Sequence, residues 1–176
     1  MQNMEEKKLA RTLRLLDGTE VPRLGQGTWY LGEGLSPRAQ ERDTLRRGVE
    51  LGMTLIDTAE MYGDGQSEEL VGEAIRGLDR DQLFLVSKVY PFHAGRGQLE
   101  RSLEASLRRL GTDYLDLYLL HWRGSVPLRE TAEEMERQVQ RGKIRSWGVS
   151  NLDRSDMEEL METGLGDHCV ADQVLY

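Results

Sequence analysis

The chain has 176 residues, with 23 Lys and Arg against 31 Asp and Glu, so its formal net charge is −8. This acidic balance excludes the basic surface by which proteins bind nucleic acids or anionic membranes. No apolar run approaches the roughly 20 residues that a membrane-spanning helix requires. The single cysteine, Cys169, excludes a disulfide framework. Charged residues from Met1 to Arg11 stand where a secretory signal is apolar, so we expect a cytoplasmic protein.

Short apolar runs alternate with helical patterns along the chain after a tail, 1–11, that we expect to be flexible. A β-hairpin is predicted first, because 12–15 and 19–22 flank the turn residues Asp17-Gly18. The predicted core strands are 24–29, 53–57, 83–88, 114–121, 144–150 and 170–176. The helices between them are predicted from apolar spacing and from terminal residues, including Pro37 at a first helical position and Asp153 as an N-cap.

Repeated strand-helix units of this kind imply a parallel sheet, either doubly wound or closed as a (β/α)8 barrel. The first strand-helix turn reads Gly25-Gln26-Gly27-Thr28-Trp29-Tyr30. It lacks the third glycine of the G-x-G-x-x-G pattern, so the dinucleotide-binding fingerprint of the doubly wound fold is absent.

Polar residues follow directly on several of the predicted strands. Asp57, Lys88, His121 and the pair Ser150-Asn151 end four strands, and Tyr62 comes five residues after Asp57. Each alone has an ordinary structural interpretation, such as a helix cap, a solvated charge or a packed ring. In a βα barrel, however, the carboxyl ends of the strands meet at the active-site mouth, so these side chains are expected to converge.

Together these residues suit the reduction of a carbonyl group. A tyrosine hydroxyl has a reference pKa of about 10, and a neighbouring lysine ammonium lowers the pKa of such a phenol. A carboxylate would keep the lysine charged and in place, and a histidine would polarise the carbonyl. Such a site lacks only a source of hydride.

At this point the chain resembles the aldo-keto reductases, from about Leu13 to Tyr176. The resemblance rests on the order and spacing of LIDTAEMYG at 55–63, LVSK at 85–88, LDLYLLHW at 115–122, GVSN at 148–151 and DQV at 172–174. Among members of the family, bacterial reductases of small aldehydes such as methylglyoxal are the most similar in character.

The resemblance implies a role for each matching residue. Tyr62 would be the proton donor, Lys88 its partner and Asp57 the anion paired with Lys88, while His121 would orient the substrate carbonyl. The hydride would come from NADPH, bound in extended form without a Rossmann fold, and no metal is implied. The implied cofactor contacts are Gly27, Thr28, Asp57, Ser150, Asn151 and Gln173. The implied substrate contacts are Trp29, Tyr62, Tyr90, His121 and Trp122.

The implied fold is a (β/α)8 TIM barrel, of which 12–176 hold only the first six strands behind an N-terminal hairpin. A barrel of this type has about 250 residues. We therefore expect a fragment of a longer protein, or a chain that needs a partner to close the sheet. An incomplete barrel is also expected to leave two open edges and an uncovered core.

The predicted function is NADPH-dependent reduction of small aldehydes and ketones to alcohols, by a monomer when full length. Two alternatives stay open: a non-catalytic nicotinamide-nucleotide-binding relative that acts as a regulatory subunit, and an inactive fragment.

Overall fold

The computed structural model describes residues 12–175, so the predicted tail 1–11 and the final Tyr176 lie outside the described residues. An antiparallel hairpin pairs β1 (Thr12–Arg14) with β2 (Glu20–Pro22), as predicted. The main sheet is parallel and has six strands in the order β3-β4-β5-β6-β7-β8. Their bounds are β3 (Gly25–Gly27), β4 (Leu55–Asp57), β5 (Phe84–Val89), β6 (Leu115–Leu120), β7 (Ile144–Ser150) and β8 (Cys169–Gln173).

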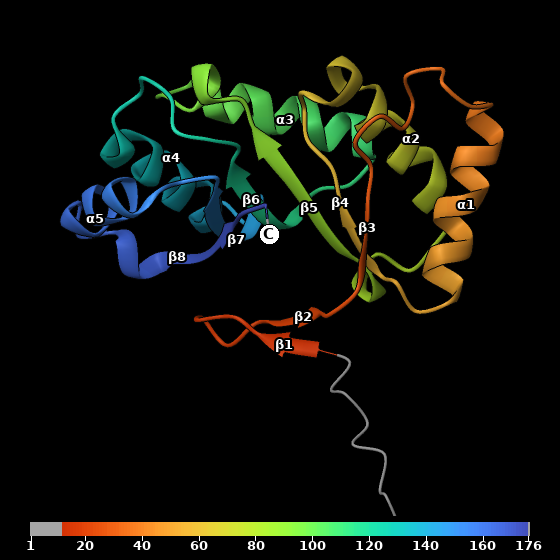
Figure 1. The fold of residues 1–176 in the computed structure, drawn as a ribbon, viewed down its shortest axis with the longest axis horizontal. Helices are drawn as coiled ribbons and strands as arrows, with labels where there is room; N and C mark the ends of the chain where they lie inside the picture. Colours follow the sequence, from red (N-terminus) through yellow and green to blue (C-terminus); the bar gives the residue numbers. More distant parts are fainter. Residues whose placement is uncertain (1–11, 176) are drawn as a thin grey trace, which may run out of the picture.

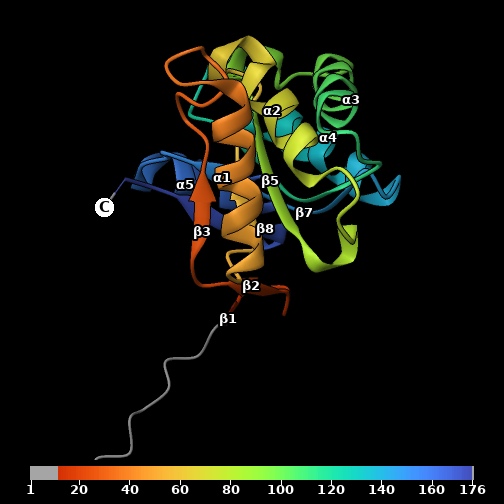
Figure 2. The ribbon, with the colours of Figure 1, turned by 90° about the vertical axis from the view of Figure 1, so that its right-hand side faces the viewer.

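The strand order decides between the two predicted architectures. Each strand of the main sheet pairs with the next one along the chain, and the order never reverses. A doubly wound sheet requires such a reversal. The barrel prediction is therefore confirmed: the sheet is a curled, partial (β/α)8 barrel, with helices around its outer face (Figures 1 and 2).

The helices follow the strands in the predicted order. Their bounds are α1 (Arg38–Glu50), α2 (Gln66–Ile75), α3 (Gln98–Leu110), α4 (Leu128–Gln140) and α5 (Arg154–Glu162). In α3, the apolar spacing puts Leu99, Leu103 and Leu107 on one buried face. That helix ends at Gly111, whose φ of 67° gives the left-handed cap that glycine favours. Asp153 forms a capping box with Asp156 at the start of α5.

Several predicted boundaries need correction. Helix α1 begins at Arg38 rather than at Pro37, which precedes the first helical residue. Strand β3 spans only Gly25–Gly27, because the chain then turns, with Leu31 N–H donating to the Thr28 carbonyl oxygen at 3.0 Å. Strand β8 ends at Gln173. Four short 3-10 turns were not predicted, since a single turn carries no periodicity: η1 (Tyr62–Gly65), η2 (Arg80–Gln82), η3 (Pro91–His93) and η4 (Gly166–His168).

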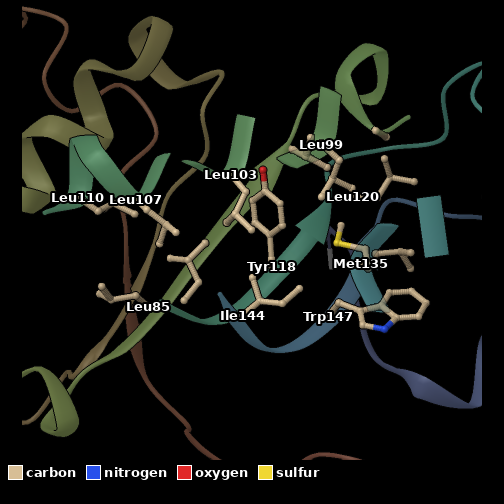
Figure 3. Packing of buried hydrophobic residues seen from close by; sticks show 14 of the residues in the cluster. Leu85, Leu99, Leu103, Leu107, Leu110, Tyr118, Leu120, Met135, Ile144 and Trp147 are labelled. Atoms are coloured by element: carbon tan, nitrogen blue, oxygen red, sulfur yellow. The ribbon is translucent and has the colours of Figure 1, made fainter. Parts of the chain in front are cut away.

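Apolar side chains pack on both faces of the sheet. On the outer face, residues of β5, β6 and β7 meet residues of α3 and α4, with Tyr118 among them (Figure 3). On the inner face, a smaller cluster contains Phe84, Val86, Leu117, Leu119 and Val170.

The inner cluster corrects the expectation of an uncovered core. All five of its members are 7% exposed or less. The reason lies in the hairpin, which sits at the amino ends of the strands and packs Leu15 and Val21 against this cluster (Figure 1). Asp17, in the hairpin turn, accepts a 2.5 Å hydrogen bond from Ser146 of β7 and so fixes the hairpin there.

Within residues 12–175, no helix is long and apolar enough to cross a membrane.

Packing of the inner face is tested by Leu119→Ala. Leu119 is 1% exposed, so we expect the truncation to lower the free energy of unfolding by about 2–4 kcal/mol, through lost burial and a residual cavity. Urea unfolding measures this change. Leu16→Ala is the control, because Leu16 is 83% exposed and its loss should cost under about 0.5 kcal/mol. Equal effects of the two variants would contradict a packed inner face.

Candidate active site

A buried lysine lies at the centre of the candidate site. Side chains alternate along β5, which puts Lys88 on the inner face beside Val86 and turns Ser87 to the outer face. Lys88 is 2% exposed. Its Nζ donates to Asp57 Oδ1 at 2.7 Å, to the Thr58 carbonyl oxygen at 2.9 Å and to Tyr62 Oη at 3.3 Å. A buried ammonium needs such partners, because an uncompensated charge in the interior is strongly destabilising.

Asp57 connects the lysine to the strand at the far edge of the sheet. It ends β4, where the register opposite Val86 brings its carboxylate beside Lys88. Its second oxygen, Oδ2, accepts a 3.1 Å hydrogen bond from Gln173 Nε2 at the end of β8. One carboxylate therefore joins residues from the second and the sixth strand of the main sheet.

Tyr62 is carried by a tight turn of unusual backbone geometry. The next three residues, Gly63, Asp64 and Gly65, have φ values of 56°, 54° and 89°. Glycine adopts this left-handed region readily, whereas Asp64 is strained there by about 1–3 kcal/mol. Strain of this kind persists only where the surrounding structure holds the turn, and it is concentrated at functional sites.

His121 is buried beside the tyrosine. Its ring lies edge-on to that of Tyr62, with 5.6 Å between the ring centres. Burial and, second, the positive charge of Lys88 lower the pKa of His121 from 6.5 to about 4, so its imidazole is neutral at physiological pH. Within residues 12–175, its Nδ1 has no hydrogen-bond partner. A neutral imidazole can donate one hydrogen bond to a substrate oxygen.

Aromatic rings extend from Tyr62 in both directions along the mouth. On one side, Trp29 stacks on Tyr62 at 6.2 Å between ring centres. On the other side, the ring centre of Trp122 lies 4.8 Å from that of His121, and the ring centre of Tyr90 lies 5.3 Å from that of Trp122. The predicted substrate contacts thus form one continuous row, and Trp29 remains 60% exposed at its end.

The predicted cofactor contacts lie at the same end of the strands. Ser150 Oγ donates to the Gln173 carbonyl oxygen at 2.7 Å, and Asn151 Nδ2 donates to the His121 carbonyl oxygen at 3.2 Å. A Cβ added to Gly27 would meet nothing within 4 Å, so space lies open above it. Thr28 differs, because it is fully buried and its Oγ1 already donates to the Asp57 carbonyl oxygen at 3.0 Å.

Sequence reasoning missed two acidic residues near the site. Glu60 Oε1 accepts a 2.6 Å hydrogen bond from the Tyr90 backbone N–H and lies 3.2 Å from Nδ1 of His93, an exposed histidine. Glu68 is fully buried on the outer side of the sheet. Glu60 lies in the turn after β4 and Glu68 on α2, where acidic residues are usually solvated, so no pattern marks these two. Within the described part of the chain, no group of His, Cys, Asp and Glu residues has the arrangement of a metal site.

The fold and the site together define a βα-barrel protein with an Asp-Lys-Tyr-His group at the carboxyl ends of its strands. A family model described as "Aldo/keto reductase family" matches residues 23–176. The chain therefore belongs to the aldo/keto reductase family, as its sequence motifs indicated.

Two members of the family are similar to this chain in sequence. The chain is 59% identical to "Methylglyoxal reductase YeaE" of Escherichia coli (strain K12) over 156 residues, which are 89% of this chain and 55% of that protein. It is 43% identical to "Aldo-keto reductase YhdN" of Bacillus subtilis (strain 168) over 154 residues, 80% of this chain and 46% of that protein. The chain spans about half the length of these curated relatives.

A solved structure shows the same fold. An aldo/keto reductase from Klebsiella pneumoniae, in complex with NADP and acetate, superimposes with a TM-score of 0.90 at 58% identity. The match covers 96% of this chain and 59% of that one.

The depressed pKa of His121 predicts how stability depends on pH. Between pH 6.5 and about 4, the unfolded chain binds a proton at this residue that the folded chain does not, so stability falls as the pH is lowered through this range. Through His121, the free energy of unfolding should fall by on the order of 2 kcal/mol between pH 7 and pH 4.5. We expect His121→Gln to abolish this part of the fall. Urea unfolding at the two pH values measures it. If His121→Gln retained the whole of the loss, the assignment would be contradicted.

Proposed function

We propose that this protein is an NADPH-dependent reductase of small aldehydes and ketones, with Tyr62 as its proton donor. The observation that carries the proposal is the buried Lys88 ammonium, held between the Asp57 carboxylate at 2.7 Å and the Tyr62 hydroxyl at 3.3 Å. A solvated surface lysine would not be 2% exposed. A protein that only bound a nucleotide would gain nothing from a phenol prepared in this way for proton transfer.

The residues at the mouth suit a nicotinamide group. Asn151 and Gln173 are exposed, and their amides carry both donors and acceptors, as does the carboxamide of a nicotinamide. The space above Gly27 permits close approach to the backbone. Asn151 and Gln173 would exchange their present bonds, to His121 and Asp57, for bonds to the cofactor. When bound, NADPH supplies a hydride to the carbonyl carbon.

The side chains around Lys88 account for the proton. Tyr62 Oη donates it to the carbonyl oxygen, and Lys88 stabilises the phenolate that remains. Asp57 and the Thr58 carbonyl oxygen hold Lys88 in place and charged. The neutral His121 donates a hydrogen bond to the same carbonyl oxygen and so polarises it before the proton moves.

The aromatic row and the relatives support a proposed substrate class. Trp29, Tyr90 and Trp122 offer flat apolar surface on both sides of Tyr62 and His121, which suits a small, weakly polar carbonyl compound. The Escherichia coli relative at 59% identity is a methylglyoxal reductase. We therefore propose methylglyoxal and similar short aldehydes as substrates.

Removal of the Tyr62 hydroxyl tests the mechanism. In Tyr62→Phe we expect methylglyoxal reduction to fall by about 10²–10⁴-fold, because general acid catalysis contributes a factor of this size. NADPH oxidation at 340 nm measures the rate. NADPH binding, followed by nucleotide fluorescence, should change little, since the lost hydroxyl contacts Lys88.

Tyr30→Phe is the matched control. Tyr30 is exposed and stacks on Trp29, so its hydroxyl lies outside the group around Lys88. Its loss should leave turnover within about twofold of the original protein. Undiminished turnover in Tyr62→Phe would eliminate the tyrosine as proton donor. A protein that binds NADPH without any turnover would instead favour the regulatory alternative.

A further inference from the structure

We propose that the ion pair between the buried Glu68 and the partly buried Arg109 positions the turn that carries Tyr62, and so sets the contact between Tyr62 and Lys88. The proposal concerns residues on the outer side of the sheet, away from any substrate. Its catalytic consequence rests on the proposed function, whereas its structural consequence does not.

Glu68 is a fully buried carboxylate with two strong partners. It is 0% exposed and lies in the first turn of α2, Gln66–Ile75. Its Oε1 accepts a hydrogen bond from Ser87 Oγ at 2.6 Å, and its Oε2 accepts one from Arg109 Nε at 2.6 Å. Short bonds to a buried charge are strong, and removing one partner leaves the other uncompensated. The carboxylate therefore joins α2 to β5 and to α3.

The ion pair and its hydrogen bonds reach the two segments that carry Lys88 and Tyr62. Ser87 directly precedes Lys88 in β5, with its side chain on the opposite face of the sheet. Arg109 packs against Gly65, the last residue of the η1 turn: a Cβ added to Gly65 would lie 2.7 Å from both Cδ and Nε of Arg109. The strand that holds Lys88 and the turn that holds Tyr62 are thus both fixed to one ion pair.

The η1 turn needs such a support. Its left-handed residues Gly63, Asp64 and Gly65 do not form a regular helix, and the strain at Asp64 favours relaxation of the backbone. Within the turn, the Tyr62 and Asp64 backbone N–H groups donate to the carbonyl oxygens of Ala59 and Met61, at 3.1 and 3.2 Å. If Arg109 left Gly65, the turn would lose a packed neighbour, and the Tyr62 hydroxyl would no longer be held 3.3 Å from Lys88.

The test compares Glu68→Gln with a variant that removes the carboxylate charge of another ion pair. Glu68→Gln keeps the shape of the side chain and removes the charge that holds Arg109. Asp116→Asn is the matched control: Asp116 is 6% exposed and accepts a 2.7 Å hydrogen bond from Arg80 Nη2, yet it lies next to the amino end of β6, opposite the mouth. Both variants remove the charge of one buried carboxylate.

Hydrogen exchange of the cofactor-free protein gives the first readout. We expect amide exchange in the segment 59–65 to accelerate roughly tenfold in Glu68→Gln and to stay near the original rate in Asp116→Asn. Kinetics give the second readout: kcat for methylglyoxal should fall roughly 10- to 100-fold in Glu68→Gln, with NADPH binding unchanged, because small displacements of reacting groups are costly.

The outcomes separate this inference from the proposed function. Unchanged exchange in 59–65 of a folded Glu68→Gln, or equal acceleration by Asp116→Asn, would overturn the inference even if the protein is a reductase. Faster exchange confined to Glu68→Gln would support it even if no substrate is turned over. If exchange accelerates while kcat stays unchanged, the turn does not control catalysis and the proposal fails in that part.

A milder pair of variants keeps the test decisive if Glu68→Gln does not fold. Ser87→Ala removes one of the two hydrogen bonds that hold the Glu68 carboxylate in place for its ion pair with Arg109. Ser146→Ala is its control, since Ser146 Oγ also donates to a carboxylate, that of Asp17 at 2.5 Å, from another strand. Exchange in 59–65 should accelerate roughly threefold in Ser87→Ala alone, and equal rates in the two variants would overturn the proposal.

Discussion

An ammonium group loses several kcal/mol of hydration when it is buried, and Lys88 recovers this only through the groups that surround it. Those groups come from separate parts of the chain: the carboxylate of Asp57 at the end of β4, the carbonyl oxygen of Thr58 and the hydroxyl of Tyr62 in the η1 turn. The register of β4 on β5 and the path of the turn are therefore tied to one charge. A shift of one residue along either strand would turn the side chain of Lys88 or Asp57 to the other face.

Strand β5 contributes to two different parts of the structure, one on each of its faces. On the inner face, Lys88 lies within the candidate active site, above the apolar cluster that the hairpin closes at the other end of the strands. On the outer face, Ser87 donates to the buried Glu68. Alternation of side chains along a strand thus connects a polar network beneath the helices with the residues that we propose to act on substrate.

Hydrophobic periodicity was sufficient to predict the order of the elements, because each strand and helix buries one face and repeats its pattern locally. The terminal residues Gly111 and Asp153 marked helix ends for equally local reasons, a left-handed backbone and a capping side chain. Strand ends also revealed Asp57, Lys88 and His121 as a group, since parallel strands bring their carboxyl ends together. The short turns escaped prediction, and so did the burial of the inner face by Leu15 and Val21, which depends on where the hairpin docks.

The sequence by itself determined that this chain forms repeated strand-helix units of the aldo/keto reductase type, with ionisable residues at the ends of the strands. Only the tertiary structure decided how those residues are paired. The bond from Gln173 to Asp57 joins residues 116 positions apart, and the bond from Arg109 to Glu68 joins residues 41 positions apart. No local pattern encodes such contacts, because they depend on the curvature of the sheet and the packing of α2 on α3. The neutral state of His121 likewise follows from burial beside Lys88, which exists only in the folded chain.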